Sequence, residues 1–291
     1  MAKKKNKKIK IIKTTIKILI IISLIIAYGY YIEPKLINTH EYQIKNERIT
    51  KNFEGFKIVH ISDIHYGRVF NKKQMQKLVK SINEQKPDIV VLTGDLIDKD
   101  TKIDNKLVEE ISIELSKIET VAGKYAINGN HDLKFDEWTN IITNSGFKNL
   151  NNTYDTIYKK GYNFMVIAGA STFKDKQGIN DKLKPALDFI NSFEKDGSIY
   201  NILLMHEPDY IDDLTDNKFN LILAGHSHAG QVRTPFAPII LPTGATKYYE
   251  KHYKLDDKDL YISNGLGVSE YNFRIFNTPS YNIYKLTNKT H

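Results

Sequence analysis

The sequence predicts an α/β fold in which buried parallel strands alternate with helices. The clearest strand is the run Ile-Val-Val-Leu at 89–92, which follows Pro87 and leads into Thr93-Gly94-Asp95. A run of branched apolar residues without polar alternation is typical of a strand covered on both faces, as in a parallel sheet. Between such runs lie segments whose apolar residues recur every three or four positions, as on one face of a helix. This alternation favours a sheet flanked by helices.

The remaining elements are predicted from the same two patterns. Apolar runs indicate further strands at 56–61, 125–127, 164–168, 202–205 and 221–224. A first helix is predicted from Met75, Leu78, Val79 and Ile82, which share one helical face, and others at 107–118, 138–142 and 182–194. The last part of the chain holds short strand-like pieces separated by Pro, Gly and Tyr. Nothing indicates a second folded domain.

The net charge is concentrated at the N-terminus. The chain has 42 Lys and Arg against 34 Asp and Glu, a formal charge of +8. Eight lysines and no acidic residue lie within residues 1–17, so the remaining 34 basic residues equal the 34 acidic ones. Nucleic-acid binding needs a basic surface that collects phosphates, and the body of this chain has no net charge. We therefore expect no nucleic-acid partner.

The lysine-rich tail continues into an apolar segment at 16–32. Seventeen residues lie at the short end of the range for a membrane span, and the tyrosines at its far end suit a membrane interface. We predict a cytoplasmic tail at 1–15, a single-pass transmembrane signal-anchor at 16–32, a linker at 33–52 that could instead hold an edge strand, and a folded domain at 53–291. The alternative is a cleaved signal peptide, with Ala-Tyr-Gly at 27–29 as an imperfect cleavage site. Either interpretation places the folded domain outside the cytoplasm, and the anchor would hold it at the cell membrane.

The absence of cysteine limits the metal ligands and nucleophiles that the chain can offer. The chain can form no disulfide, and it offers no thiolate as a metal ligand or as a nucleophile. The stability of an exported domain must then come from core burial or from bound metal.

Side chains that can bind a metal follow five of the predicted strands. They are Asp63 and His65, Asp95, Asn130 and His131, His206, and finally His226 and His228. A single histidine at a strand end is more often a hydrogen-bonded turn residue, but the joint occurrence of all eight groups indicates a metal centre. Imidazole and carboxylate without thiolate suit Mn, Fe or Zn. Eight groups exceed the needs of one four-coordinate ion, so two divalent transition metal ions are predicted.

These residues belong to motifs that resemble a known family. Asp63-Ile64-His65, Gly94-Asp95, Gly129-Asn130-His131-Asp132, His206-Glu207-Pro208 and Gly225-His226-Ser227-His228 resemble, in this order, the motifs of the calcineurin-like metallophosphoesterase superfamily. The resemblance covers about 56–286, and the residues after His228 are similar to its bacterial membrane-associated phosphodiesterase branch. Ala229 stands where members often have Gly, which tolerates positive φ better. The resemblance implies a four-layer α/β/β/α sandwich of two mixed sheets.

The resemblance also implies a role for each residue. It implies one metal ion held by Asp63, His65 and His228, a second held by Asn130, His206 and His226, and Asp95 as the bridge. His131 is implied to steady the phosphate or to protonate the leaving oxygen, with Asp132 as its candidate partner. Arg68 and Arg233 lie near the ligand motifs and are candidate phosphate contacts, although surface arginines need no such role.

We therefore expect a two-metal phosphoesterase that hydrolyses a phosphodiester or pyrophosphate bond through attack by a metal-bound hydroxide. The predicted anchor favours a small-molecule or lipid phosphoester of the cell envelope as the substrate. Two alternatives stay open: a phosphomonoesterase of the same fold, and a non-catalytic metal-binding scaffold. A scaffold would usually have lost a ligand, and every ligand position of the motifs is filled here.

Overall fold

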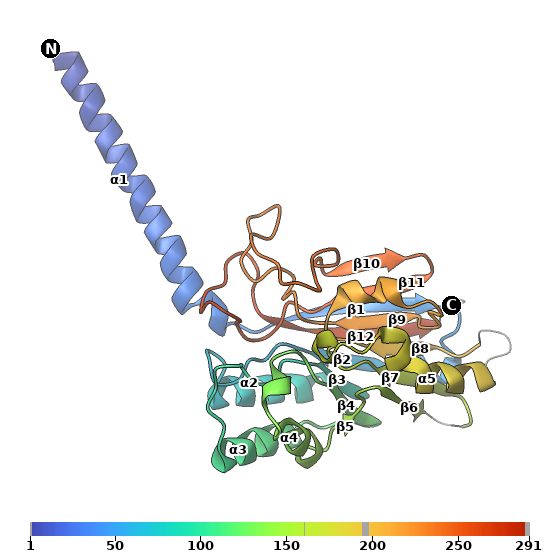
Figure 1. Ribbon diagram of the computed structural model, residues 1–291. Coiled ribbons are helices and arrows are strands. Elements are labelled where there is room, and N and C mark those ends of the chain that lie inside the picture. The colour runs from blue at the N-terminus through green and yellow to red at the C-terminus, as the bar shows by residue number, and fades with distance from the viewer. Residues whose placement is uncertain (1, 160, 194–197, 289–291) are drawn as a thin grey trace.

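The computed structural model describes residues 2–159, 161–193 and 198–288, in which two six-stranded sheets face each other (Figure 1). The strand order is β1-β12-β2-β3-β4-β5 in the first sheet and β10-β11-β9-β8-β7-β6 in the second. Both sheets are mixed, because β12 runs antiparallel to β2 in the first, and β6 and β10 run antiparallel to their neighbours in the second. Helices cover the outer faces. The predicted pair of mixed sheets with flanking helices is confirmed.

The first sheet carries three helices on its outer face. Its strands are β1 (Asn38–Asn46), β2 (Lys57–Ile61), β3 (Ile89–Thr93), β4 (Gly123–Ile127), β5 (Lys148–Asn149) and β12 (Ser280–Asn288). Its helices are α2 (Lys72–Gln85), α3 (Asn105–Ser116) and α4 (Trp138–Asn144). Side chains cap the first two helices: Asn71 accepts from the backbone N–H of Lys73, and Asp104 accepts from that of Leu107. These caps satisfy donors that the first helical turn leaves free.

The second sheet is covered by α5 (Ile179–Phe193). Its strands are β6 (Thr153–Tyr158), β7 (Phe164–Gly169), β8 (Asn201–Leu204), β9 (Leu221–Ala224), β10 (His252–Leu255) and β11 (Lys258–Ile262). Short 3₁₀ helices lie at η1 (Glu33–Lys35), η2 (Lys51–Phe53), η3 (Asp132–Lys134), η4 (Phe173–Asp175) and η5 (Pro208–Asp213). Residue 194, the last of the predicted helix 182–194, lies outside the described residues.

Residues of β3 show why the central strands are apolar without alternation. Val90 and Leu92 pack in the core between the first sheet and its helices, whereas Ile89 and Val91 pack in the core between the two sheets. Both faces of the strand are therefore shielded from water, so positions 89–92 are all apolar. Asp95 follows the end of this strand, which is packed between two hydrophobic cores.

Helix α1 (Ala2–Tyr31) projects away from the sheets (Figure 1). Among the described residues, no helix is long and apolar enough to cross a membrane. The transmembrane span predicted at 16–32 is not supported. Its strongly apolar part, 18–27, has lysines before it and tyrosines after it, and ten residues at about 1.5 Å each give about 15 Å. This is roughly half of the hydrocarbon thickness of about 30 Å.

The segment 33–52, predicted as a linker or an edge strand, contains an edge strand of the first sheet. β1 pairs in parallel with β12 over its whole length, from Asn38 opposite Ser280 to Asn46 opposite Asn288. This part of the chain therefore belongs to the folded domain, which begins before residue 53. The strand was hard to recognise because Ile44 is its one buried residue.

Candidate metal centre

The eight predicted side chains meet where β2, β3, β4, β8 and β9 end. Three overlapping groups each have ligand atoms within 4.8 Å of one another: Asp63, His65 and His228; His65, Asp95 and His131; and Asp95, His206 and His226. Asn130 joins the third group, since its Oδ1 lies 3.2 Å from Nε2 of His206. The carboxyl ends of both sheets thus open onto one centre, which is where open α/β sheets bind ligands.

Five of the seven candidate ligands have a left-handed backbone. Their φ angles are 51° at Asp63, 45° at His65, 52° at Asp95, 65° at His226 and 50° at His228. Positive φ is uncommon for residues that carry a Cβ, and it persists where the surrounding structure enforces it. Ala229 shares this conformation, with φ of 48°, so the chain keeps the loop shape at that position without a glycine.

Gly94 lets the ligand loops approach one another. Its φ is +93°, and a Cβ there would lie 2.6 Å from both the backbone N of Gly129 and Nδ1 of His206. A side chain at this position would push β3 away from its neighbours. Gly94 is therefore required for Asp95 to stand between the other ligands.

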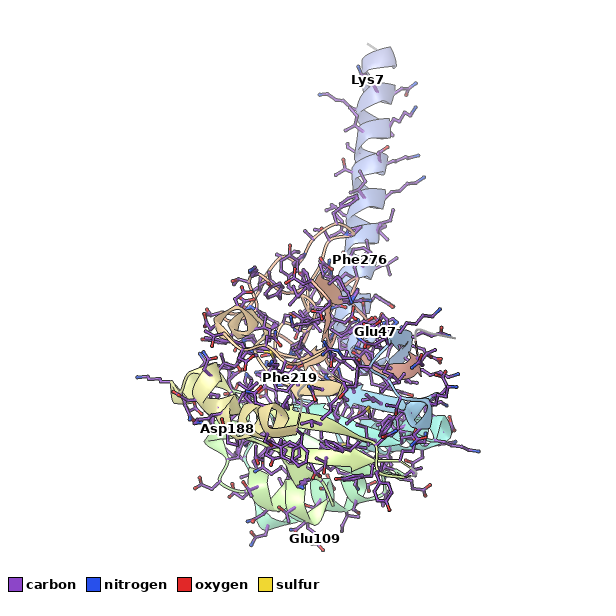
Figure 2. The ribbon with its side chains drawn as sticks, turned by 90° about the vertical axis from the view of Figure 1, so that its right-hand side faces the viewer. Lys7, Glu47, Glu109, Asp188, Phe219 and Phe276 are labelled. Carbon is purple, nitrogen blue, oxygen red and sulfur yellow. The ribbon has the colours of Figure 1, made fainter. Side chains whose placement is uncertain are left out.

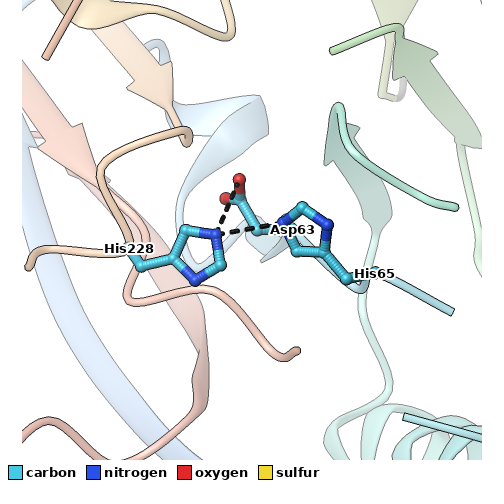
Figure 3. Close-up of side chains that lie close together, drawn as sticks. All are labelled: Asp63, His65 and His228. Carbon is cyan, nitrogen blue, oxygen red and sulfur yellow. Dashed lines mark hydrogen bonds and ion pairs between the residues drawn. The ribbon is translucent and has the colours of Figure 1, made fainter. Parts of the chain in front are cut away.

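The first site is formed by Asp63, His65 and His228 (Figure 3). Nε2 of His65 and Nε2 of His228 are 3.1 Å apart, and the latter lies 3.5 Å from Oδ1 of Asp63. Burial raises the pKa of Asp63, although neighbouring histidines oppose the rise. Two ring nitrogens and a carboxylate that converge in a buried place fit a divalent cation, which would supply the missing positive charge.

The second site is formed by His206, His226, Asn130 and Asp95. Nδ1 of His206 donates to the Thr93 carbonyl at 2.7 Å, so Nε2 keeps its lone pair and faces Asn130. Nε2 of His226 lies 2.9 Å from the Thr243 carbonyl, which likewise leaves Nδ1 free. Ring N–H groups that donate to backbone carbonyls are typical of metal-bound histidines. The residues present therefore fit a second ion of the same class.

Asp95 lies between the two sites. Its Oδ2 is 3.7 Å from Nε2 of His65 and 3.4 Å from Nε2 of His206. Burial would raise the pKa of Asp95, but His206, His131 and His65 hold it well below its usual range. The side chain is therefore a carboxylate at neutral pH and is placed to serve both groups.

His131 presents a ring N–H beside these ligands. Its Nδ1 accepts a hydrogen bond from the backbone N–H of Lys99 at 3.2 Å, so the neutral ring carries its proton on Nε2, 4.0 Å from Oδ2 of Asp95. Burial lowers the pKa of His131 to about 4, against the opposing charge of Asp95. A neutral ring can donate a hydrogen bond but is not an imidazolium acid. Of the two implied roles, the geometry favours steadying a phosphoryl oxygen.

Asp132 binds the backbone and not the His131 ring. Its Oδ1 accepts from the N–H groups of Leu96 and Ile97, at 2.9 and 3.2 Å, and its Oδ2 accepts from that of Gly129 at 2.8 Å. The carboxylate thus joins the loop after β3 to the loop after β4. The sequence predicted a different contact for it.

Asp98 is the carboxylate that faces the histidine rings, and the sequence prediction missed it. Its Oδ2 lies 3.6 Å from Nδ1 of His65 and 3.8 Å from Nδ1 of His131. Burial would raise the pKa of Asp98, but His65, the Asp100 N–H and Arg68 lower it to about 2. A carboxylate behind a metal-bound histidine fixes the ring orientation. The signal in the sequence was a second Asp three positions after Asp95.

We expect Asp98→Asn to weaken Mn²⁺ binding by about 10- to 100-fold, because such carboxylates orient the ligand rings. The measurement is a calorimetric Mn²⁺ titration of the full chain. Asp100→Asn is the matched control, since it removes a charge from the same loop at a side chain that is 62% exposed. Equal Mn²⁺ affinity in Asp98→Asn and the wild type would contradict this role.

Both candidate phosphate arginines are paired with acids. Arg68 lies 3.3 Å from Asp98 and 3.0 Å from Asp100, and Arg233 lies 2.7 Å from Glu250 and donates to the Ala229 carbonyl. Neither lines the cleft of about 280 Å³ that opens over the site. That cleft contains Asp95, Asn130, His131, His226 and His228 with Lys174, Ile240, Glu270 and Tyr271 around them. Lys174 is the one Lys or Arg among the described residues of the cleft, and no pattern in the sequence indicated it.

The chain is similar to known metallophosphoesterases. The model of the calcineurin-like phosphoesterase family matches residues 56–230. The chain is 34% identical to the uncharacterized metallophosphoesterase YkuE of Bacillus subtilis over 268 residues, covering 89% of this chain and 90% of that protein. It is 25% identical to a Danio rerio protein named transmembrane protein with metallophosphoesterase domain, over 88% of this chain and 58% of that protein. A crystal structure of a dimetal phosphatase from Danio rerio aligns with TM-score 0.45 and 10% identity over 73% of this chain and 88% of that chain.

Proposed function

Because the chain belongs to the calcineurin-like phosphoesterase family, we propose that it hydrolyses a phosphodiester or pyrophosphate bond with the help of two divalent transition metal ions. The observation that carries the proposal is the position of Asp95 between two groups of histidines, 3.7 Å from His65 and 3.4 Å from His206. When bound, a metal pair acts as a Lewis acid on phosphoryl oxygens and lowers the pKa of water. Mn, Fe and Zn all suit these nitrogen and oxygen ligands.

The side chains have distinct tasks in this proposal. Asp63, His65 and His228 would hold one ion, Asn130, His206 and His226 would hold the other, and Asp95 lies close enough to serve both groups. His131 donates its Nε2–H to a phosphoryl oxygen and stabilises the charge that develops there. Asp98, 3.6 Å from Nδ1 of His65, keeps the ring of that ligand oriented. Ser227 is the serine of these motifs that lines the cleft, but it is 2% exposed and its Oγ accepts from the Ala229 N–H at 3.0 Å, so we assign the attack to water and not to a side chain.

The charge of the cleft supports a diester over a monoester. A phosphomonoester is a dianion near neutral pH, whereas a diester has one negative charge. Among the described residues that line the cleft, Lys174 is the one Lys or Arg, Glu270 is paired with Lys99, and Arg68 and Arg233 are paired with acids outside the cleft. A monoester would find little additional positive charge here.

A substrate comparison tests the proposal. The Mn²⁺-loaded full chain is assayed on an aryl phosphodiester, an aryl phosphomonoester and a nucleotide-linked pyrophosphate, and we expect kcat/KM for the diester or the pyrophosphate to exceed that for the monoester by at least about tenfold. Preference for the monoester would support the phosphomonoesterase alternative. A protein that binds two ions and turns over none of the three would be the scaffold.

We also propose that α1 binds the enzyme to an anionic membrane, where a lipid phosphoester is the substrate. Isoleucines from Ile9 to Ile26 are exposed along the helix, and the lysines on its N-terminal half would meet lipid phosphates. Figure 2 shows Lys7 near the far end of α1, away from the sheets. Phe236 and Ile239, which are 91% and 60% exposed, lie in the loop that continues to Ile240 at the cleft. The location of the domain outside the cytoplasm stays a prediction.

Vesicle flotation tests the membrane proposal. We expect the full chain to float with vesicles that contain phosphatidylglycerol, and Ile20→Ser combined with Leu24→Ser to abolish flotation, because apolar contact drives insertion. Ile113→Ser on α3, also an exposed isoleucine, is the control and should float as the wild type does. A wild-type chain that stays with the unbound fraction at low salt would refute the proposal.

A further inference from the structure

The foot of α1, defined here as residues 28–35, is joined to the loop that carries His228. Glu33 is 2% exposed, and its Oε1 accepts hydrogen bonds from the Asn277 backbone N–H at 2.9 Å and from the Thr278 hydroxyl at 3.4 Å. The side-chain amide of Asn277 donates in turn to the His228 carbonyl, and to the Gly230 carbonyl at 2.9 Å. One polar side chain therefore separates Glu33 from the backbone of a candidate ligand.

Arg274 makes a second connection, directly to the ring. Its side chain is 0% exposed, and Nη2 lies 2.9 Å from Nδ1 of His228. The same guanidinium donates to the Gly267 carbonyl at 2.6 Å and to the Asn277 carbonyl at 3.0 Å. The Arg274 guanidinium thus lies against the Nδ1 edge of the His228 ring, and the opposite nitrogen, Nε2, is the one directed at Asp63.

The foot of α1 also contacts Arg274 through its backbone. The Arg274 N–H donates to the Gly29 carbonyl at 3.0 Å. A Cβ at Gly29 would lie 2.3 Å from the ring of Phe273, and that ring packs 5.1 Å from the ring of Tyr30. The helix end and the 273–278 segment are thus in close contact, and Figure 2 shows Phe276 beside the lower part of the helix.

We infer that Glu33 and Arg274 are positioning residues of the metal centre, through which the N-terminal segment holds His228 in place. A buried carboxylate and a buried guanidinium are costly to desolvate, so each requires the partners described above. Neither residue lies within 56–230, the part matched by the family model. The contact makes α1 part of the catalytic domain and not merely an appendage to it.

The test is a calorimetric Mn²⁺ titration of the full-length chain with circular dichroism as the check on folding. The inference rests on the proposed function, because it takes His228 as a ligand of one of two ions. Arg274→Met and Glu33→Ala should each weaken one of the two Mn²⁺ equivalents by at least about tenfold and leave the other unchanged, as loss of a ligand's supporting contact does. Glu33→Gln, which keeps an acceptor oxygen, should lose less. Phe276→Ala and Lys35→Gln are the controls, since both side chains are exposed beside the same contacts.

Each outcome separates the two proposals. A wild-type chain that binds fewer than two equivalents would contradict the proposed function itself. Two equivalents in the wild type with equal affinities in Arg274→Met and Glu33→Ala would overturn the inference alone, as would equal weakening of both ions. If Arg274→Met fails to fold, Arg274→Lys takes its place, because it keeps the buried charge while losing the contact geometry.

Discussion

Asp95→Asn is expected to reduce turnover by about 10³-fold or more and to weaken both metal equivalents together. Asp95 is the carboxylate that lies near both ligand groups, 3.7 Å from His65 and 3.4 Å from His206. An amide keeps the shape of the side chain but removes the negative charge that two cations would share. Metal ions contribute several kcal/mol to transition-state stabilisation, and each 1.36 kcal/mol is about tenfold in rate.

The measurement is kcat on the best substrate of the three-substrate comparison, together with the Mn²⁺ titration. Asp136→Asn is the matched control, because Asp136 is an exposed aspartate five positions after His131. If Asp95→Asn keeps more than a tenth of the wild-type rate, or loses only one ion, Asp95 is not the bridge.

His131→Ala is expected to lower kcat by about 10²- to 10³-fold while both ions stay bound. The reason is the loss of one donor to the phosphoryl oxygen, a change that costs this much in comparable oxyanion sites. His131→Gln, which can present an N–H near the same place, should recover part of the rate. Retained Mn²⁺ binding is the control, because His131 is not assigned as a ligand.

Leaving-group dependence separates the two implied roles of His131. A donor to the phosphoryl oxygen stabilises the same charge for every ester, so the loss in His131→Ala should be equal for nitrophenyl and alkyl diesters. A general acid would matter little for nitrophenolate, which leaves without a proton, and much for an alkoxide. A loss confined to the alkyl ester would therefore assign proton transfer to His131 and contradict the neutral-donor role.

The central strands were predicted well because a strand that is buried on both faces consists of consecutive apolar residues, which can be seen in the sequence. Every position of Ile89–Thr93 is buried, and the predicted strand coincides with β3. The helices around Met75 and at 107–118 were predicted because their apolar residues lie on one face, and they correspond to α2 and α3. In contrast, β1 is largely exposed, and its partner β12 lies more than two hundred residues away along the chain. No local pattern could indicate that pairing.

The candidate ligands were predicted for a similar reason, and their supporting residues were not. Asp63 or His226 follows an apolar run directly, so its position in the sequence reveals its place at the sheet edge. Arg274 lies in a segment without periodic structure, and nothing nearby in the sequence indicates that its guanidinium is buried against His228. Lys174 likewise has no signal in the sequence, because its proximity to the site depends on how separate loops fold back.

The left-handed backbone at Asp63, His65, Asp95, His226 and His228 has a consequence for how the protein acquires its ions. A left-handed backbone at residues with a Cβ persists only where the surrounding packing enforces it, so the conformational entropy of these loops is lost when the chain folds and not when metal arrives. An incoming ion then exchanges its water ligands for side chains that the folded loops already hold in position. Uptake should proceed at the pace of ion dehydration, and the emptied centre should keep its shape for the next ion.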